Sequence, residues 1–103
     1  MTAAESFEVR FHTGGRVRPQ NPFHLSGPGR IGIGQDFITI SGNARRSFRA
    51  GKPATETVRR VDIVNAWSDG ERVQFDEQRV SGDRSVGFTV DDPEIAQRIL
   101  ALL

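Results

Sequence analysis

The apolar residues of this chain change their spacing once, near residue 91, and that change limits the folds that the chain can adopt. Before it, apolar residues alternate with polar ones in short runs separated by glycine and proline, which is typical of β-strands joined by turns. After it, Ile95, Ile99 and Leu102 recur at the spacing of one helix face. Such a short helix is marginal alone, so it must pack against the strands.

The first strand is predicted over residues 6–12, where Phe7, Val9 and Phe11 alternate with polar residues. Residues 13–29 contain several glycines and prolines and predict a loop. Residues 30–90 hold the remaining strands, which we expect at Arg30–Gly34, Phe37–Ser41, Ala44–Arg49, Thr57–Trp67, Arg72–Phe75 and Ser85–Val90. The stretch from Gly51 to Thr55 is expected to interrupt pairing, and Asp69-Gly70 predicts a tight hairpin.

The closing helix is predicted over residues 92–103. Asp91 or Asp92 can cap its first turn, and Pro93 suits the first helical position. A chain of 103 residues fits one domain, residues 1–103. The sequence therefore predicts a mainly β fold: a partly open, seven-stranded antiparallel barrel, or a two-sheet sandwich, capped by one C-terminal helix.

The composition favours a cytoplasmic location. The chain has no cysteine, which fits a reducing compartment. Its first residues lack the basic and apolar regions of a secretory signal, and no apolar stretch approaches the ~18 residues that span a bilayer. The net charge is +1, but residues 1–60 are predominantly basic and residues 61–103 predominantly acidic.

The basic half contains one dense cluster: Arg45, Arg46, Arg49, Lys52, Arg59 and Arg60. If these residues lie on adjacent strands, they form a basic face that can attract anionic lipid. The competing interpretation is an ordinary solvated strand face. Binding of nucleic acid is disfavoured, because the acidic half opposes a polyanion and the nearby aromatics, Phe37 and Phe48, are better explained as core or half-buried strand residues.

No residue pattern indicates catalysis. His12 and His24 are the two histidines, and neither has carboxylates at metal-ligand spacing. The chain lacks a G-x-S-x-G nucleophile motif and the Lys-Ser/Thr of a phosphate-binding loop. We therefore expect no catalytic residue, no metal site and no cofactor. Trp67, beside the Asp-Gly turn, is a candidate interface anchor, although packing under the helix is the favoured interpretation.

The order of elements resembles that of pleckstrin-homology-like domains, including the GRAM subgroup. The segments that carry the resemblance are Gly29-Arg30-Ile31-Gly32-Ile33, Asp36-Phe37-Ile38-Thr39-Ile40, Val61-Asp62-Ile63-Val64-Asn65 and Val86-Gly87-Phe88, followed by the helix. Many such domains have a tryptophan in the final helix, which this chain lacks. Those that bind inositol phosphates usually have a basic first hairpin loop, whereas here that loop is Gly34-Gln35-Asp36.

The stretch Pro22–Arg30, together with Arg45-Arg46, Phe48 and Asp62-Ile63, also resembles the soluble N-terminal region of some bacterial rhomboid-family membrane proteins. That resemblance implies that the catalytic serine and histidine lie in a membrane part outside these residues. An end at Leu102-Leu103 fits a domain that precedes a membrane segment.

We therefore expect a non-catalytic interaction or regulatory module, at the cytoplasmic face of a larger membrane protein. It would present a strand edge or a basic face to a protein partner or to the rest of its own chain. The alternatives are an adaptor that binds anionic lipid surfaces through the arginine cluster, and a small enzyme or nucleic-acid-binding barrel. The sequence leaves the partner and the oligomeric state open.

Overall fold

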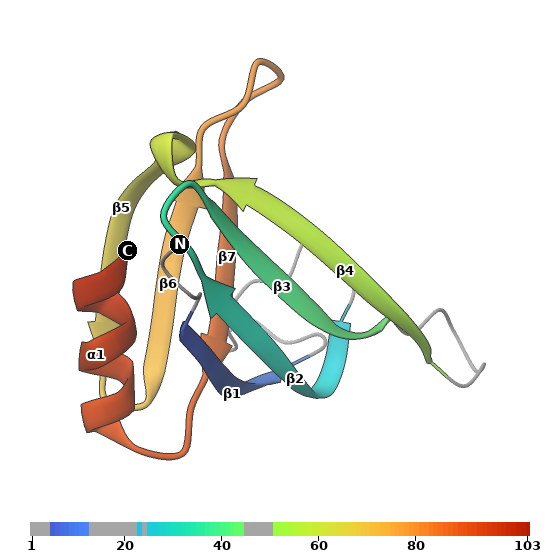
Figure 1. Ribbon diagram of the computed structural model, residues 1–103, viewed down its shortest axis with the longest axis vertical. Helices are drawn as coiled ribbons and strands as arrows, with labels where there is room; N and C mark the ends of the chain where they lie inside the picture. Colours follow the sequence, from blue (N-terminus) through green and yellow to red (C-terminus); the bar gives the residue numbers. More distant parts are fainter. Residues whose placement is uncertain (1–4, 13–22, 24, 45–50) are drawn as a thin grey trace.

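The computed structural model describes residues 5–12, 23, 25–44 and 51–103. Figure 1 shows that they form a bent sheet with one helix at its side. In chain order the elements are β1 (Glu5–Phe11), β2 (Leu25–Ile33), β3 (Phe37–Ala44), β4 (Lys52–Arg59), the 3-10 turn η1 (Arg60–Asp62), β5 (Ile63–Asp69), β6 (Arg72–Glu77), β7 (Arg84–Thr89) and α1 (Pro93–Leu102).

All seven strands belong to one antiparallel sheet, in the order β4-β3-β2-β1-β7-β6-β5. β1 and β7 pair only at Arg10 and Thr89, so the two halves of the sheet diverge from that point. Within the described residues β4 and β5 are the two outer strands and do not pair with each other. The predicted seven antiparallel strands and C-terminal helix are confirmed. The sheet is single rather than a two-sheet sandwich, and it is not closed into a barrel.

The loop predicted for residues 13–29 is too long, because β2 already begins at Leu25, opposite Ala44. The glycine and proline that indicated a loop lie instead at an irregularity in the strand. The register with β3 shifts between Ser26 and Arg30, and Gly27 has a φ of 71°. Glycine and proline are common at such bulges, where they bend a strand without ending it.

The single long strand predicted over Thr57–Trp67 is also wrong. The chain turns at η1 and continues as a separate strand on the other side of the molecule.

The expected interruption from Gly51 to Thr55 lies mostly inside β4, which pairs with β3 from Lys52 onwards. Pro53 is tolerated there because β4 is an outer strand. The strand predicted at Ala44–Arg49 lies outside the described residues, except for Ala44 at the end of β3.

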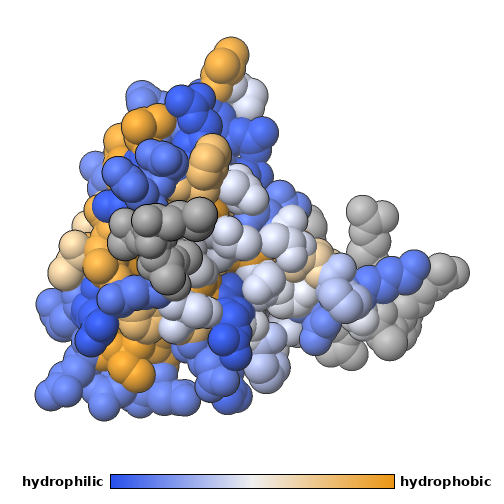
Figure 2. Space-filling model, in the orientation of Figure 1, coloured by the Kyte–Doolittle hydropathy of each residue, from blue (hydrophilic) through white to orange (hydrophobic). Residues whose placement is uncertain are grey.

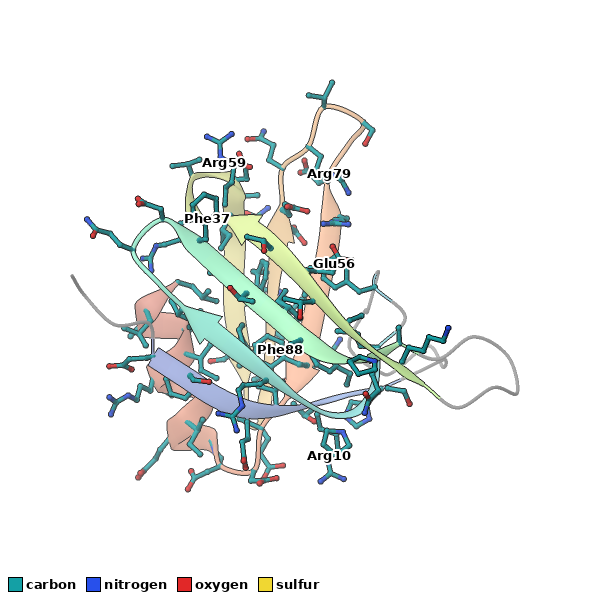
Figure 3. The ribbon with its side chains drawn as sticks, turned by 45° about the vertical axis from the view of Figure 1, so that its right-hand side comes forward. Arg10, Phe37, Glu56, Arg59, Arg79 and Phe88 are labelled. Carbon is teal, nitrogen blue, oxygen red and sulfur yellow. The ribbon has the colours of Figure 1, made fainter. Side chains whose placement is uncertain are left out.

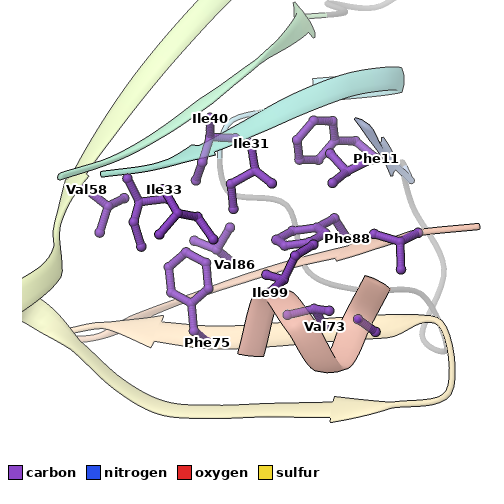
Figure 4. Packing of buried hydrophobic residues seen from close by; sticks show 14 of the residues in the cluster. Phe11, Ile31, Ile33, Ile40, Val58, Val73, Phe75, Val86, Phe88 and Ile99 are labelled. Carbon is purple, nitrogen blue, oxygen red and sulfur yellow. The ribbon is translucent and has the colours of Figure 1, made fainter. Parts of the chain in front are cut away.

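One hydrophobic core fills the concave side of the sheet (Figure 4). Alternate residues of the strands point into it, as their period-two patterns predict. Its fully buried members include Ile31 and Ile40 from the first half of the sheet, and Phe75 and Phe88 from the second. Because both halves contribute to the same cluster, they stabilise each other even though few of their strands pair.

The helix closes the core on the side of β5 and β6 (Figure 1). Asp92 caps it: its Oδ1 accepts a hydrogen bond from the backbone N–H of Glu94 at 2.8 Å. Ile99 is fully buried and points toward Phe88 in Figure 4, while Ile95 and Leu102 are partly buried against the core. The predicted cap and apolar face are therefore confirmed.

Three turns meet at one end of the molecule, at the top of Figure 1. The backbone N–H of Arg60 in η1 donates to the carbonyl of Asp36, in the turn between β2 and β3, at 3.0 Å. On the other side of η1, the N–H of Gln78 donates to the carbonyl of Asp62 at 2.7 Å. These bonds join the β2–β3 turn, η1 and the base of the β6–β7 hairpin.

Candidate interaction surfaces

The six residues of the predicted basic cluster do not all lie together. Arg45, Arg46 and Arg49 lie outside the described residues. Lys52 and Arg59 are the two ends of β4, which places them ~23 Å apart along the strand. Their odd separation also puts them on opposite faces of the sheet. Lys52 is therefore not part of one surface with Arg59 and Arg60.

Arg59 and Arg60 lie at the end where the three turns meet. Arg59 is exposed and pairs across the sheet with Phe37, as Figure 3 shows. Arg60 Nη1 donates a hydrogen bond to the carbonyl of Gly34 at 3.1 Å, so this guanidinium stabilises the β2–β3 turn. Phe37 is 52% exposed, which contradicts its prediction as a core or half-buried residue. The reason is that Phe37 begins β3 on the convex face, whereas Ile38 and Ile40 take the inward positions.

Trp67 does not pack under the helix, so that favoured prediction is wrong. Its side chain is 39% exposed on the convex face of β5, and the guanidinium of Arg72 lies 5.3 Å from the ring centroid. The cause is a bulge. The register between β5 and β6 shifts between Val64 and Trp67, and Asn65 adopts a φ of 53°. After the shift Ala66 packs against the core and Trp67 points outward.

Asn65 is a residue whose importance the sequence analysis missed. Its Nδ2 donates to Asp76 Oδ2 at 3.3 Å, and the same carboxylate accepts from Ser85 Oγ at 2.6 Å. These bonds join β5, β6 and β7 on the convex face and hold the bulge that exposes Trp67. Asparagine tolerates positive φ better than most residues, so an Asn inside a strand pattern was an available signal.

The two outer strands differ in how well they resist further pairing. β4 carries Lys52, Pro53, Glu56 and Arg59, and charge and proline both discourage another strand from adding to an edge. β5 has no charged residue from Ile63 to Ser68 and ends at Asp69. Within the described residues, the features of β5 that oppose pairing are its bulge and the charge of Asp69 at its end. The edge of β5 is therefore the less protected one.

A groove on the convex face was also missed by the sequence analysis. It has a volume of about 430 Å³ and is lined by β1, β2, β3, the last residue of β7 and the two residues that follow it. Arg10 and Arg30 contribute positive charge, and Glu8 and Asp91 contribute negative charge. Arg30 Nη2 lies 3.7 Å from Glu8 Oε1, in a pair whose side chains are both more than half exposed. Such a pair contributes little energy, and the mixed charges select no single class of ligand.

The most buried charge in the described residues belongs to the sheet itself. Glu77, 7% exposed, forms an ion pair with Arg84 directly across from it on β7. The guanidinium of Arg84 also lies 4.5 Å from the centroid of the Phe23 ring. This arrangement brings Phe23 against the start of β7, and both charges are compensated. We interpret it as structural, since removing one partner of such a pair leaves a costly buried charge.

The remaining candidates for chemistry are few within the described part of the chain. His12 Nε2 lies 2.8 Å from Thr89 Oγ1, whereas His24 falls outside it. No three described His, Asp or Glu residues are grouped as metal ligands. No described helix has the length and hydropathy needed to cross a membrane.

A scan against protein-family models found no match, and searches of curated proteins and of solved structures found no significantly similar protein.

Proposed function

We propose that this domain is a non-catalytic interaction module that binds an extended segment of a protein partner at the free edge of β5. The observation that carries the proposal is the contrast between the two outer strands. β4 is protected by charge and proline, and β5 is uncharged from Ile63 to Ser68. A partner strand that pairs with β5 extends the sheet through backbone hydrogen bonds.

The geometry of the β5–β6 hairpin supplies donors and acceptors for that pairing. Its turn consists of Gly70 and Glu71, so Asp69 and Arg72 form the closing pair. Along an antiparallel pair, the backbone N–H and C=O groups of successive residues alternately bond to the partner strand and point away from it. The N–H and C=O of Ser68 therefore point to the free edge.

Side chains on both sides of this edge can add affinity. On the convex face Trp67 offers an exposed ring, with Arg72 beside it. Tryptophan and arginine are both enriched among the residues that contribute most to protein interfaces. On the concave side α1 packs along β5, and Gln97 Nε2 donates to Ser68 Oγ at 3.4 Å. A bound segment would thus lie between a helix and an aromatic side chain.

The family resemblance and the cellular location of the domain are also parts of this proposal. The order of the strands and the closing helix agree with the resemblance to pleckstrin-homology-like domains, which commonly act as adaptors. We place the domain in the cytoplasm, as part of a larger membrane protein. The alternative of a lipid adaptor that uses one continuous arginine cluster has less support, because Lys52 lies far from Arg59 and Arg60.

Selection of peptides from a random display library, followed by NMR titration of the labelled domain, tests the proposal. We expect selected peptides to shift the amide signals of β5 and α1. Ser68→Pro removes the outward N–H and should weaken binding by about tenfold, since one hydrogen bond and strand geometry are lost. Trp67→Ala should also weaken it, whereas Phe37→Ala, which removes an exposed aromatic elsewhere, should not.

Circular dichroism shows whether each variant is folded. The proposal is wrong if the peptides shift signals away from β5, or if folded Ser68→Pro and Trp67→Ala variants bind them as tightly as the wild type does.

A further inference from the structure

A second surface, unrelated to the edge of β5, lies at the end where the three turns meet. Three residues there, which we call the apolar tips, are exposed: Phe37 by 52%, Val61 by 75% and Val80 by 110%. They account for all but one of the exposed large hydrophobic residues in the described part of the chain, the other being Trp67. Single exposed apolar residues are common on protein surfaces, but here three of the four described ones lie at the same end of the molecule.

The segments that carry the three tips are joined by backbone hydrogen bonds. Phe37 directly follows the β2–β3 turn, Val61 lies in η1, and Val80 lies in the β6–β7 hairpin. The backbone bonds from Arg60 to Asp36 and from Gln78 to Asp62 join the β2–β3 turn, η1 and the base of that hairpin. Val80 lies in a turn closed by a bond of 3.0 Å from the N–H of Gly82 to the carbonyl of Arg79. This hairpin extends beyond the rest of the molecule in Figure 1, and Figure 2 shows hydrophobic surface at its tip.

The charges around the tips are balanced. Arg59 and Arg79 are exposed on this end of the molecule, as Figure 3 shows. Asp36 and Asp83 are exposed beside them, in the β2–β3 turn and the β6–β7 hairpin. Attraction to a strongly charged partner is therefore weak, and apolar contact must supply most of the binding energy.

We propose that this end docks on a phospholipid bilayer, with Val80, Val61 and Phe37 entering the boundary between headgroups and acyl chains. Arg59 and Arg79 are placed to contact the lipid phosphates, which every phospholipid carries. A bilayer fits better than a protein because the tips are convex and lie on separate turns. A protein interface needs a continuous complementary surface of roughly 800 Å² per partner, whereas a fluid bilayer adapts to separate tips.

The absence of cysteine from the chain allows a direct test by single-site labelling. Val80→Cys carries an environment-sensitive fluorophore, and Lys52→Cys, at the far end of β4, carries the same label as the control. With phosphatidylcholine vesicles, we expect blue-shifted and stronger emission from the label at position 80 and no change at position 52. Equal responses at the two positions, or none at position 80, would overturn the proposal.

Vesicle flotation gives an independent measurement. Val80→Asp should reduce the bound fraction about tenfold, because it replaces an inserted side chain by a charge. Adding phosphatidylserine should have a smaller effect than this substitution. Binding that requires phosphatidylserine and persists in Val80→Asp would mean that basic residues elsewhere hold the membrane, and the proposal would be wrong. Ser68→Pro should leave flotation unchanged, because Ser68 lies at the edge of β5 and not among the apolar tips. A failure of membrane docking can therefore be distinguished from a failure of peptide binding at β5.

Discussion

At the scale of single residues, the close contact between Phe11 and Gly29 leaves no room for a side chain at position 29. A Cβ atom at position 29 would lie 2.3 Å from Phe11 Cε2 and 2.6 Å from the carbonyl oxygen of Ser41. Both distances are far below van der Waals contact, and one partner is backbone that cannot rotate away. The Phe11 ring also packs edge-on against Phe88, with centroids 6.4 Å apart, which restricts its movement away from position 29.

Gly29→Ala should therefore reduce the free energy of unfolding by about 2 to 3 kcal/mol, as overpacking a filled core does. Urea denaturation followed by circular dichroism measures the change. Gly32→Ala is the matched control on the same strand, because its Cβ would lie 3.9 Å from Thr39 Cβ, and it should change stability by about 0.5 kcal/mol or less. Phe11→Leu should offset part of the Gly29→Ala loss, and simple additivity of the two would contradict the contact.

At the scale of elements, α1 shows how a marginal helix becomes stable through docking. Asp92 caps its first turn, and the Arg98 guanidinium forms an ion pair with Glu5 of β1 at 3.2 Å. This pair is exposed and contributes little. The main contribution comes from Ile99 and Ala96, which are both fully buried against the strands.

Ile99→Ala should lower the free energy of unfolding by about 3 to 4 kcal/mol, because the core loses apolar contact and retains a cavity. Thermal and urea melts measure this loss. Gln97→Ala, two positions away on the exposed side of α1, should change stability by about 0.5 kcal/mol or less. If both variants melted like the wild type, α1 would not depend on docking.

At the scale of the whole molecule, the two halves of the sheet share a core but few hydrogen bonds. β1 to β4 form one half and β5 to β7 the other, and the described strands connect them by pairing only at Arg10 and Thr89. Their inward-facing residues nevertheless form a single cluster. Neither half can therefore bury its apolar face without the other.

We expect the domain to unfold in one cooperative transition. Native-state hydrogen exchange should give the most protected amides of β2 and β3 the same opening free energy as those of β6 and β7, within about 1 kcal/mol. That value should match the global free energy from denaturation. A clearly lower value for one half would show that the halves unfold separately, and that the shared core does not couple them.

Local chemistry was enough to predict several elements correctly. Asp92, Pro93 and the spacing of Ile95 and Ile99 predict α1 because capping and helical periodicity depend on residues close in sequence. A hairpin near Asp69-Gly70 was predictable for the same reason, although Asp69 pairs with Arg72 and the turn is Gly70-Glu71. Boundaries failed where pairing outweighed local preference: Pro53 lies within β4, and the glycines near Pro28 lie within β2.

The sequence by itself determined a mainly β domain with antiparallel strands and one docked C-terminal helix, because alternation, turns and caps are local properties. Only the tertiary structure decided which surfaces are exposed. Trp67 points outward because a bulge shifts the register of β5, and Lys52 is separated from Arg59 because β4 is extended. Phe37, Val61 and Val80 come together because long-range hydrogen bonds join their turns. Such neighbours are set by contacts between distant residues, which no local pattern encodes.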